Sequence, residues 1–81
     1  MSELNYGKLQ EYLALADREL NRLVSCAMSK VNAQKTTGEA LDHYQKQELA
    51  ICELITYVSY AMKTADDLAK EHQDFKEKYG D

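Results

Sequence analysis

The chain is 81 residues long, enough for one small domain. It has no proline, three glycines, and 44% apolar beside 30% charged residues, a composition that favours an all-helical fold and excludes collagenous and disordered chains. Ten Lys and Arg against fourteen Asp and Glu leave a net charge of −4, the wrong sign for a protein that binds a nucleic acid polymer through its phosphates. A domain of this size has a marginal core, so we expect self-association or a partner.

The first predicted element is a helix before the polar segment 32–38. Apolar residues recur there with helical rather than strand spacing. Ser2 and Asn5 are both acceptable N-cap residues, so we expect the helix to begin near one of them. It should end near Ala33, where the polar segment begins.

A second helix is predicted after this segment. Thr36, followed three residues later by Glu39, matches a capping box, and the helix should begin at about residue 37. The sequence therefore predicts a single all-α domain, residues 1–81, folded as an antiparallel helical hairpin of two long helices with a turn near residues 33–37.

The two predicted helices carry heptad-like apolar seams. The first seam consists of Leu9, Leu13, Ala16, Leu20, Leu23 and Ala27. The second consists of Leu41, Tyr44, Glu48, Ile51, Ile55, Val58, Met62, Ala65 and Ala69. Facing residues in an antiparallel hairpin have numbers with a constant sum, and a sum of 71 matches the two seams. This register lets Leu23 face Glu48, and Arg22 could pair with Glu48 at the edge.

The middle of the second helix is apolar almost all the way round, so one neighbouring helix cannot cover it. We predict that its uncovered side, with a flank of the first helix, forms an interface with a second copy or another protein. The candidate interface residues are Leu54, Tyr57, Ala61, Leu68 and Phe75 on the second helix, and Tyr12 and Leu15 on the first.

Two arrangements are open for the end of the chain, where His72, Phe75 and Tyr79 extend past the start of the first helix. In one, the second helix continues to about Tyr79 and the hairpin is completed by homo-oligomerisation. In the other, a break near Thr64 folds the last segment back into a three-helix bundle. The sequence favours the first, because no glycine, proline or loop accompanies Thr64.

The sequence contains no phosphate-binding loop, nucleophile elbow or metal-ligand pattern, so we expect neither an enzyme nor a cofactor or metal. In the predicted hairpin, Cys26 and Cys52 lie too far apart for an internal disulfide, which favours a reducing, cytoplasmic setting. No apolar run approaches the ~20 residues that cross a membrane.

Six tyrosines are the one compositional feature that points to function, because tyrosine is suited to interfaces. The leading hypothesis is a non-enzymatic protein-interaction module, a small self-associating regulator, adaptor or inhibitor that binds a protein partner. The alternative is an oligomeric binder of a small anionic ligand such as a nucleotide, with Arg18, Arg22, Tyr57 and Tyr60 at subunit interfaces. A third possibility is a helical domain of a larger enzyme.

Overall fold

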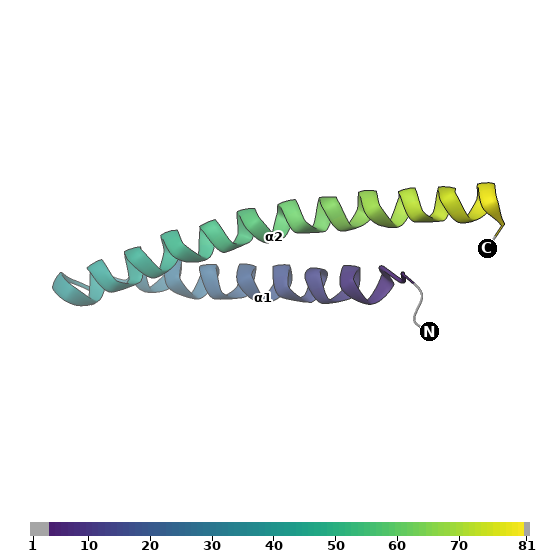
Figure 1. Ribbon diagram of the computed structural model, residues 1–81. Helices are drawn as coiled ribbons and strands as arrows, with labels where there is room; N and C mark the ends of the chain where they lie inside the picture. Colours follow the sequence, from purple (N-terminus) through teal and green to yellow (C-terminus); the bar gives the residue numbers. More distant parts are fainter. Residues whose placement is uncertain (1–3, 81) are drawn as a thin grey trace.

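A computed structural model describes residues 4–80 as two helices joined by a short turn. Helix α1 spans Gly7–Asn32 and helix α2 spans Gly38–Tyr79. The helices run antiparallel and side by side, with both ends of the chain at the end opposite the turn, and the longer α2 extends past the start of α1 (Figure 1). The predicted all-α hairpin and the position of its turn are confirmed.

The N-cap of helix α1 is Tyr6, whose side chain makes no capping hydrogen bond. The predicted N-cap role of Asn5 is therefore wrong by one residue, and the other candidate, Ser2, lies outside the described residues. Asn5 still contributes to the helix start, because the backbone N–H of Gly7 donates a hydrogen bond to Asn5 Oδ1 at 2.9 Å, which satisfies one of the amides that a helix start leaves without a partner. The helix ends at Asn32, and the N–H of Ala33 donates to the carbonyl of Lys30 at 3.2 Å.

Helix α2 begins differently from the prediction. Its N-cap is Thr37, whose side chain makes no capping hydrogen bond, and the predicted capping box between Thr36 and Glu39 is wrong. The cause is Gly38, which has a φ of 60° and so enters the helix from the left-handed region that glycine adopts without strain. This backbone turn moves the N-cap one residue along the chain, and Glu39 no longer occupies the third helical position that the box requires.

The far end of α2 continues without a break for 42 residues, passing through Thr64. The three-helix alternative is therefore wrong. The helix ends at Gly80, whose left-handed backbone lets its N–H donate to the carbonyl of Lys76 at 2.8 Å. Lys76 and Lys78 lie in the last turn, where positive charge is favourable at the negative end of the helix dipole.

Two alanines are the buried residues of the described chain, Ala27 of α1 towards the turn at 6% exposure and Ala65 of α2 towards the open end at 2%. Small side chains at these positions let the helix backbones approach each other. Around them the contact side consists of half-buried residues. On α1 these are Gln10, Leu13, Ala16, Asp17, Leu20, Val24 and Val31.

The predicted seam of α1 is therefore correct at Leu13, Ala16, Leu20 and Ala27 and wrong at Leu9 and Leu23. Leu9 and Leu23 are exposed, and the following residues, Gln10 and Val24, lie on the contact side instead. Adjacent helical residues differ by about 100° in direction, so the seam has turned by one residue at these positions.

The register of the two helices also differs from the prediction at the open end of the hairpin. A constant sum of 71 places Gln10 level with Ala61, yet the Gln10 side-chain amide donates to Asp66 at 2.8 Å. Arg22 pairs with Glu19 on its own helix at 3.0 Å, so its predicted contact with Glu48 is wrong.

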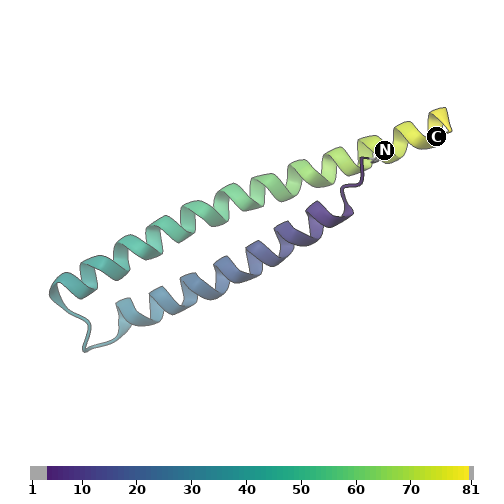
Figure 2. The ribbon, with the colours of Figure 1, turned by 60° about the horizontal axis from the view of Figure 1, so that its bottom comes forward.

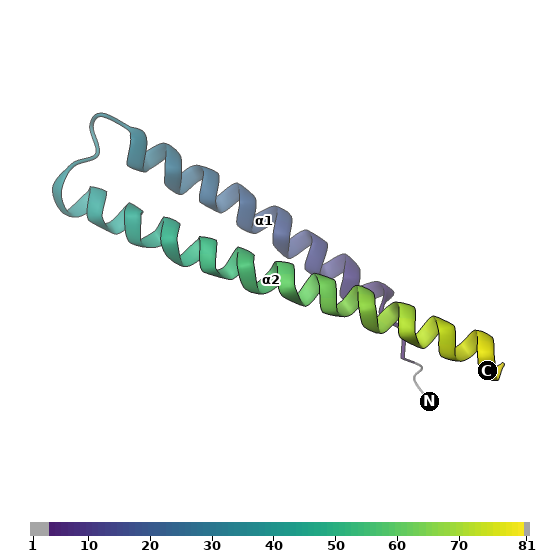
Figure 3. The same ribbon diagram turned by 90° about the horizontal axis from the view of Figure 1, so that it is seen from above.

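The hairpin is a thin rod, as two further views show (Figures 2 and 3). Its extents are 62 × 18 × 16 Å and its radius of gyration is 18.7 Å. A compact chain of this length has a radius of gyration of about 12 Å. Two helices in contact along one side leave most of each helix uncovered. Six of the seven candidate interface residues are exposed, and the seventh, Ala61, is half-buried.

Candidate functional site

Five predicted interface residues of α2 lie along one side of this helix, and we name them the α2 stripe: Leu54, Tyr57, Ala61, Leu68 and Phe75. Their spacing of three, four and seven residues keeps them in line. Tyr57 is 67% exposed, Phe75 54% and Leu68 41%. The same spacing runs back from Leu54 to Gln47 and His43, so the side of α2 that carries the stripe extends to the turn.

Helix α1 adds to the same face of the hairpin. Leu23 and Cys26 of α1 line one shallow groove together with His43 and Gln47 of α2. Leu9 and Tyr12 repeat the position of Leu23 at helical spacing and are also exposed. Leu9 and Leu23 were assigned to the seam from the sequence. The structure places them on the exposed side of α1 instead, near Tyr12.

Leu15, the other predicted interface residue of α1, is also exposed. It follows Tyr12 by three residues, which places it about 60° further round the helix. Leu15 therefore lies beside Tyr12, and the two candidate residues of α1 form a flank of the face rather than its centre.

The groove near the turn, which we name the turn groove, has a volume of about 240 Å³. Its walls come from both helices and its lining is largely apolar. The lining residues are Leu23, Cys26, Ala27, Lys30, His43, Tyr44, Gln47 and Ile51. Lys30 and His43 are its basic side chains, so the groove combines an apolar floor with positive charge.

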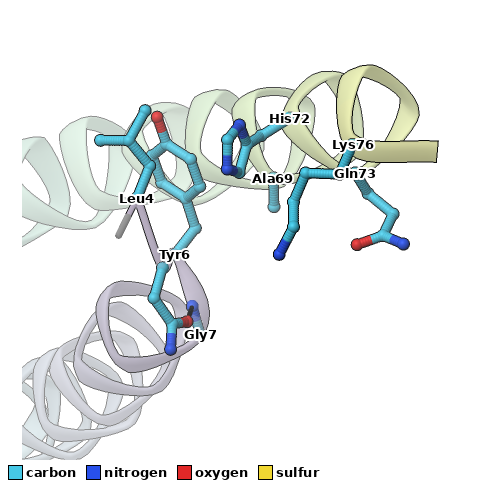
Figure 4. Close-up of a pocket in the computed structure, with 8 residues that line it drawn as sticks. Leu4, Tyr6, Gly7, Ala69, His72, Gln73 and Lys76 are labelled. Carbon is cyan, nitrogen blue, oxygen red and sulfur yellow. Dashed lines mark hydrogen bonds between the residues drawn. The ribbon is translucent and has the colours of Figure 1, made fainter. Parts of the chain in front are cut away.

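A second cavity, of about 280 Å³, lies at the open end of the hairpin, where the start of the chain crosses α2 (Figure 4). Tyr6 and His72 meet there edge to face, with ring centroids 6.1 Å apart and an angle of 73° between the rings. Lys76 lies at the same cavity. The contact joins the segment before α1 to the far part of α2.

Aromatic rings continue from this cavity along the end of α2. His72 stacks on Phe75 with centroids 6.4 Å apart, and Phe75 lies 4.8 Å from Tyr79. We name Tyr6, His72, Phe75 and Tyr79 the aromatic ladder. Of these, only Phe75 was a predicted site residue; Tyr6 had no signal in the sequence, because it lies before the helix and reaches His72 only through the fold.

The residues predicted to bind an anionic ligand are not gathered within one hairpin. Neither described cavity is lined by Arg18, Arg22, Tyr57 or Tyr60. The guanidinium of Arg22 donates from Nε and Nη2 to Glu19 Oε2, at 3.1 and 3.0 Å, and this carboxylate raises the pKa of Arg22 above its usual range. Tyr60 is the most exposed of the large aromatic side chains of the described chain, at 74%.

Within residues 4–80, no three His, Cys, Asp or Glu side chains are grouped so that they could hold a metal ion. Cys26 and Cys52 are free thiols and both are exposed. Neither α1 nor α2 has a stretch long and apolar enough to cross a membrane.

Comparison with known proteins gives no relative. The chain matches no protein family, and it shows no significant similarity to a curated protein or to a solved structure.

Proposed function

We propose that this protein is a non-enzymatic interaction module, a small helical regulator, adaptor or inhibitor that associates with itself and acts by occupying a surface of a protein partner. The observation that carries the proposal is the imbalance of its apolar side chains. The described residues bury two alanines, while large side chains such as Leu54, Tyr57 and Phe75 remain exposed. Apolar faces of this extent mark protein–protein contact sites.

The chemistry of the face suits a helix-in-groove contact. Leu54, Leu68 and Phe75 provide apolar anchors in one line along α2, as an amphipathic helix does when it fills the groove of a partner. Tyr57 adds a large flat surface with few rotatable bonds, a property shared by residues that dominate binding energy. A protein that acts by covering a partner's surface requires no reacting group. The two free thiols are exposed, and a cytoplasmic location would keep them reduced.

Site-specific photocrosslinking in cells tests the proposal. A photoreactive phenylalanine analogue at Tyr57 should give a discrete covalent adduct with one other protein, and the same analogue at Lys63, which lies outside the α2 stripe, should not. Adducts between copies of this chain are recognised by masses that are multiples of 9.3 kDa.

The adduct protein, purified, should bind the wild-type chain at least ten times more tightly than the Tyr57→Glu variant. Equal binding of the two chains, or equal adduct formation at positions 57 and 63, would contradict the proposal. Circular dichroism of Tyr57→Glu, with Lys63→Glu as the matched variant, checks that the helices are intact.

The alternative function is an oligomer that binds a small anionic ligand such as a nucleotide. The observation in its favour is the exposure of Tyr57 and Tyr60, whose rings are free to stack on a planar base at a contact between subunits. Arg18 would meet the phosphate, because Arg22 is already paired with Glu19. A thermal-shift panel of nucleotides tests this function, since a ligand at one hundred times its dissociation constant adds about 2.7 kcal/mol to the unfolding free energy. If no nucleotide raised the melting temperature, the nucleotides tested would be excluded as ligands.

A further inference from the structure

We infer that the α2 stripe is covered by a second copy of this chain, packed antiparallel about a two-fold axis near Ser59, with the exposed end of the aromatic ladder seated in the partner's turn groove. The inference deepens the proposed function, on which it rests, by naming the first occupant of the apolar face and its register. A protein partner then competes with the second copy for the α2 stripe, so crosslinking at Tyr57 captures whichever of the two is bound. Ser59 is the middle of α2, which spans Gly38–Tyr79, so this axis gives the longest possible overlap of the two α2 helices.

The exposed area matches such a contact. The hairpin exposes 6709 Å². A compact protein of 9.3 kDa exposes about 5,000 Å², so the excess is about 1,700 Å² per chain. Each partner in a standard interface contributes about 800 Å², and obligate dimers bury more. One face of the rod, along most of its 62 Å length, provides area on this scale.

The register is set by the two ends of α2, which differ and complement each other. About the axis at Ser59, residue 75 of one copy is level with residue 43 of the other. Phe75, which is exposed, therefore lies at the turn groove of the partner, level with the partner's His43. Tyr79, also exposed, lies one helical turn further on, level with the partner's Glu39. The groove is apolar with Lys30 at its edge, and the end of α2 brings aromatic rings together with both acidic residues, Glu71 and Asp74, and basic ones, Lys76 and Lys78.

The middle of the stripe pairs large side chains with small ones in this register. Tyr57 is level with the partner's Ala61, and Leu68 with the partner's Ala50. Such alternation lets two helices approach closely and fill the space between them. Because the two-fold axis repeats each contact, these two pairings supply four layers of the interface.

Charge favours the antiparallel direction. Along the edge of the α2 stripe, Glu71 is next to the level of the partner's Lys46, and Lys78 is next to the level of the partner's Glu39. A parallel pair would instead place each of these residues beside its own copy, and like charges across a helical interface are unfavourable.

Disulfide formation between two cysteine variants tests the register. In a chain whose native thiols are replaced by Cys26→Ser and Cys52→Ala, one batch carries His43→Cys and a second carries Phe75→Cys. Mixed under mild oxidation, the two should give a mixed disulfide at least ten times faster than the matched pair Gln45→Cys and Gln73→Cys, which has the same sum of residue numbers but lies outside the stripe. Each variant alone should stay reduced, because positions 43 and 43 of an antiparallel pair lie about 48 Å apart at 1.5 Å per residue.

Sedimentation equilibrium of the wild-type chain tests the association itself. It should give twice the 9.3 kDa chain mass. Leu68→Ala should raise the dissociation constant at least tenfold, whereas Leu49→Ala, the same change at an exposed leucine outside the stripe, should leave it within twofold. A second comparison, Phe75→Ala against Leu49→Ala, covers the case in which Leu68→Ala unfolds the chain.

The possible results separate this inference from the proposed function. A monomer at all concentrations, or disulfides within each single-variant batch, would overturn the antiparallel pair. If the crosslinking at Tyr57 still captured another protein, the interaction module would stand without it. A mass of four chains that keeps the mixed disulfide supports the antiparallel pair as the unit of a larger assembly.

Discussion

The side-chain amide of Gln10 in α1 donates a hydrogen bond to Asp66 in α2 across 2.8 Å. This contact joins residues that are 56 positions apart in the chain and shows the register of the two helices at the open end of the hairpin. Gln10 is half-buried, but the bond itself is exposed, so water competes with it and its net contribution is small.

We therefore expect Gln10→Ala to lower the unfolding free energy by about 0.5–1 kcal/mol. Urea unfolding at a fixed protein concentration measures the change, since the stability of an associating chain depends on concentration. Gln45→Ala, an exposed glutamine of α2, is the matched control. A double-mutant cycle with Asp66→Ala should show a coupling energy, and additive losses would mean that the two side chains do not interact.

Ala65 is the most buried residue of the described chain, with 2% of its surface exposed, and it lies on the side of α2 that packs against α1. A larger side chain there must push the helices apart, so Ala65→Leu should cost about 1–3 kcal/mol of unfolding free energy. Ala40→Leu makes the same change at an exposed position of α2 and should be nearly neutral. Thermal unfolding followed by circular dichroism compares the two variants. Equal melting temperatures would show that α1 does not pack at Ala65.

Gly38 enters α2 with a φ of 60°. A residue with a Cβ is strained in this region, so Gly38→Ala should destabilise the hairpin by about 1–2 kcal/mol. Asparagine tolerates the left-handed region better than alanine, so Gly38→Asn should lower the unfolding free energy by less than Gly38→Ala does. The order of the three unfolding free energies, Gly above Asn above Ala, is the expected result. If alanine were the most stable of the three, the turn would have a different backbone.

Asn5, the residue before the N-cap of α1, accepts a hydrogen bond from the N–H of Gly7, the first residue of the helix. Asn5→Ala should cost about 1 kcal/mol and speed hydrogen exchange of the amides in the first turn. Asn21→Ala is the contrasting change, because Asn21 lies inside α1 and bonds the carbonyl of Asp17. Alanine has the higher helix propensity there, so this variant should be as stable as the wild type or slightly more stable. The same loss in both variants would argue against this hydrogen bond.

Much of the fold could be predicted from the sequence. The apolar spacing, the absence of proline and the polar segment 32–38 determined two helices, their direction and the place of the turn. Local chemistry indicated that Asn5 acts at the start of α1, where it accepts a bond from a residue two positions away, although the N-cap itself is Tyr6. The candidate residues Leu54, Tyr57 and Phe75 also followed from spacing, because a helix that is apolar on two sides cannot hide both against a single neighbour.

The buried side of α1 near its two deviating leucines and the register of the two helices were decided by the packing of the helices together. Leu9 and Gln10, or Leu23 and Val24, differ by about 100° around α1, and periodicity alone does not say which of two adjacent stripes faces the neighbour. The sequence also leaves the register of the two helices open, because a heptad pattern repeats and several shifts of one helix along the other bring the two apolar seams together. Contacts between distant residues, such as Gln10 with Asp66 and Tyr6 with His72, select one of them. The sequence by itself determined the helices, their turn and the buried side of α2, whose predicted seam is buried or half-buried throughout. The tertiary structure decided the register of the two helices and which of two adjacent stripes of α1 is buried at Leu9 and Leu23.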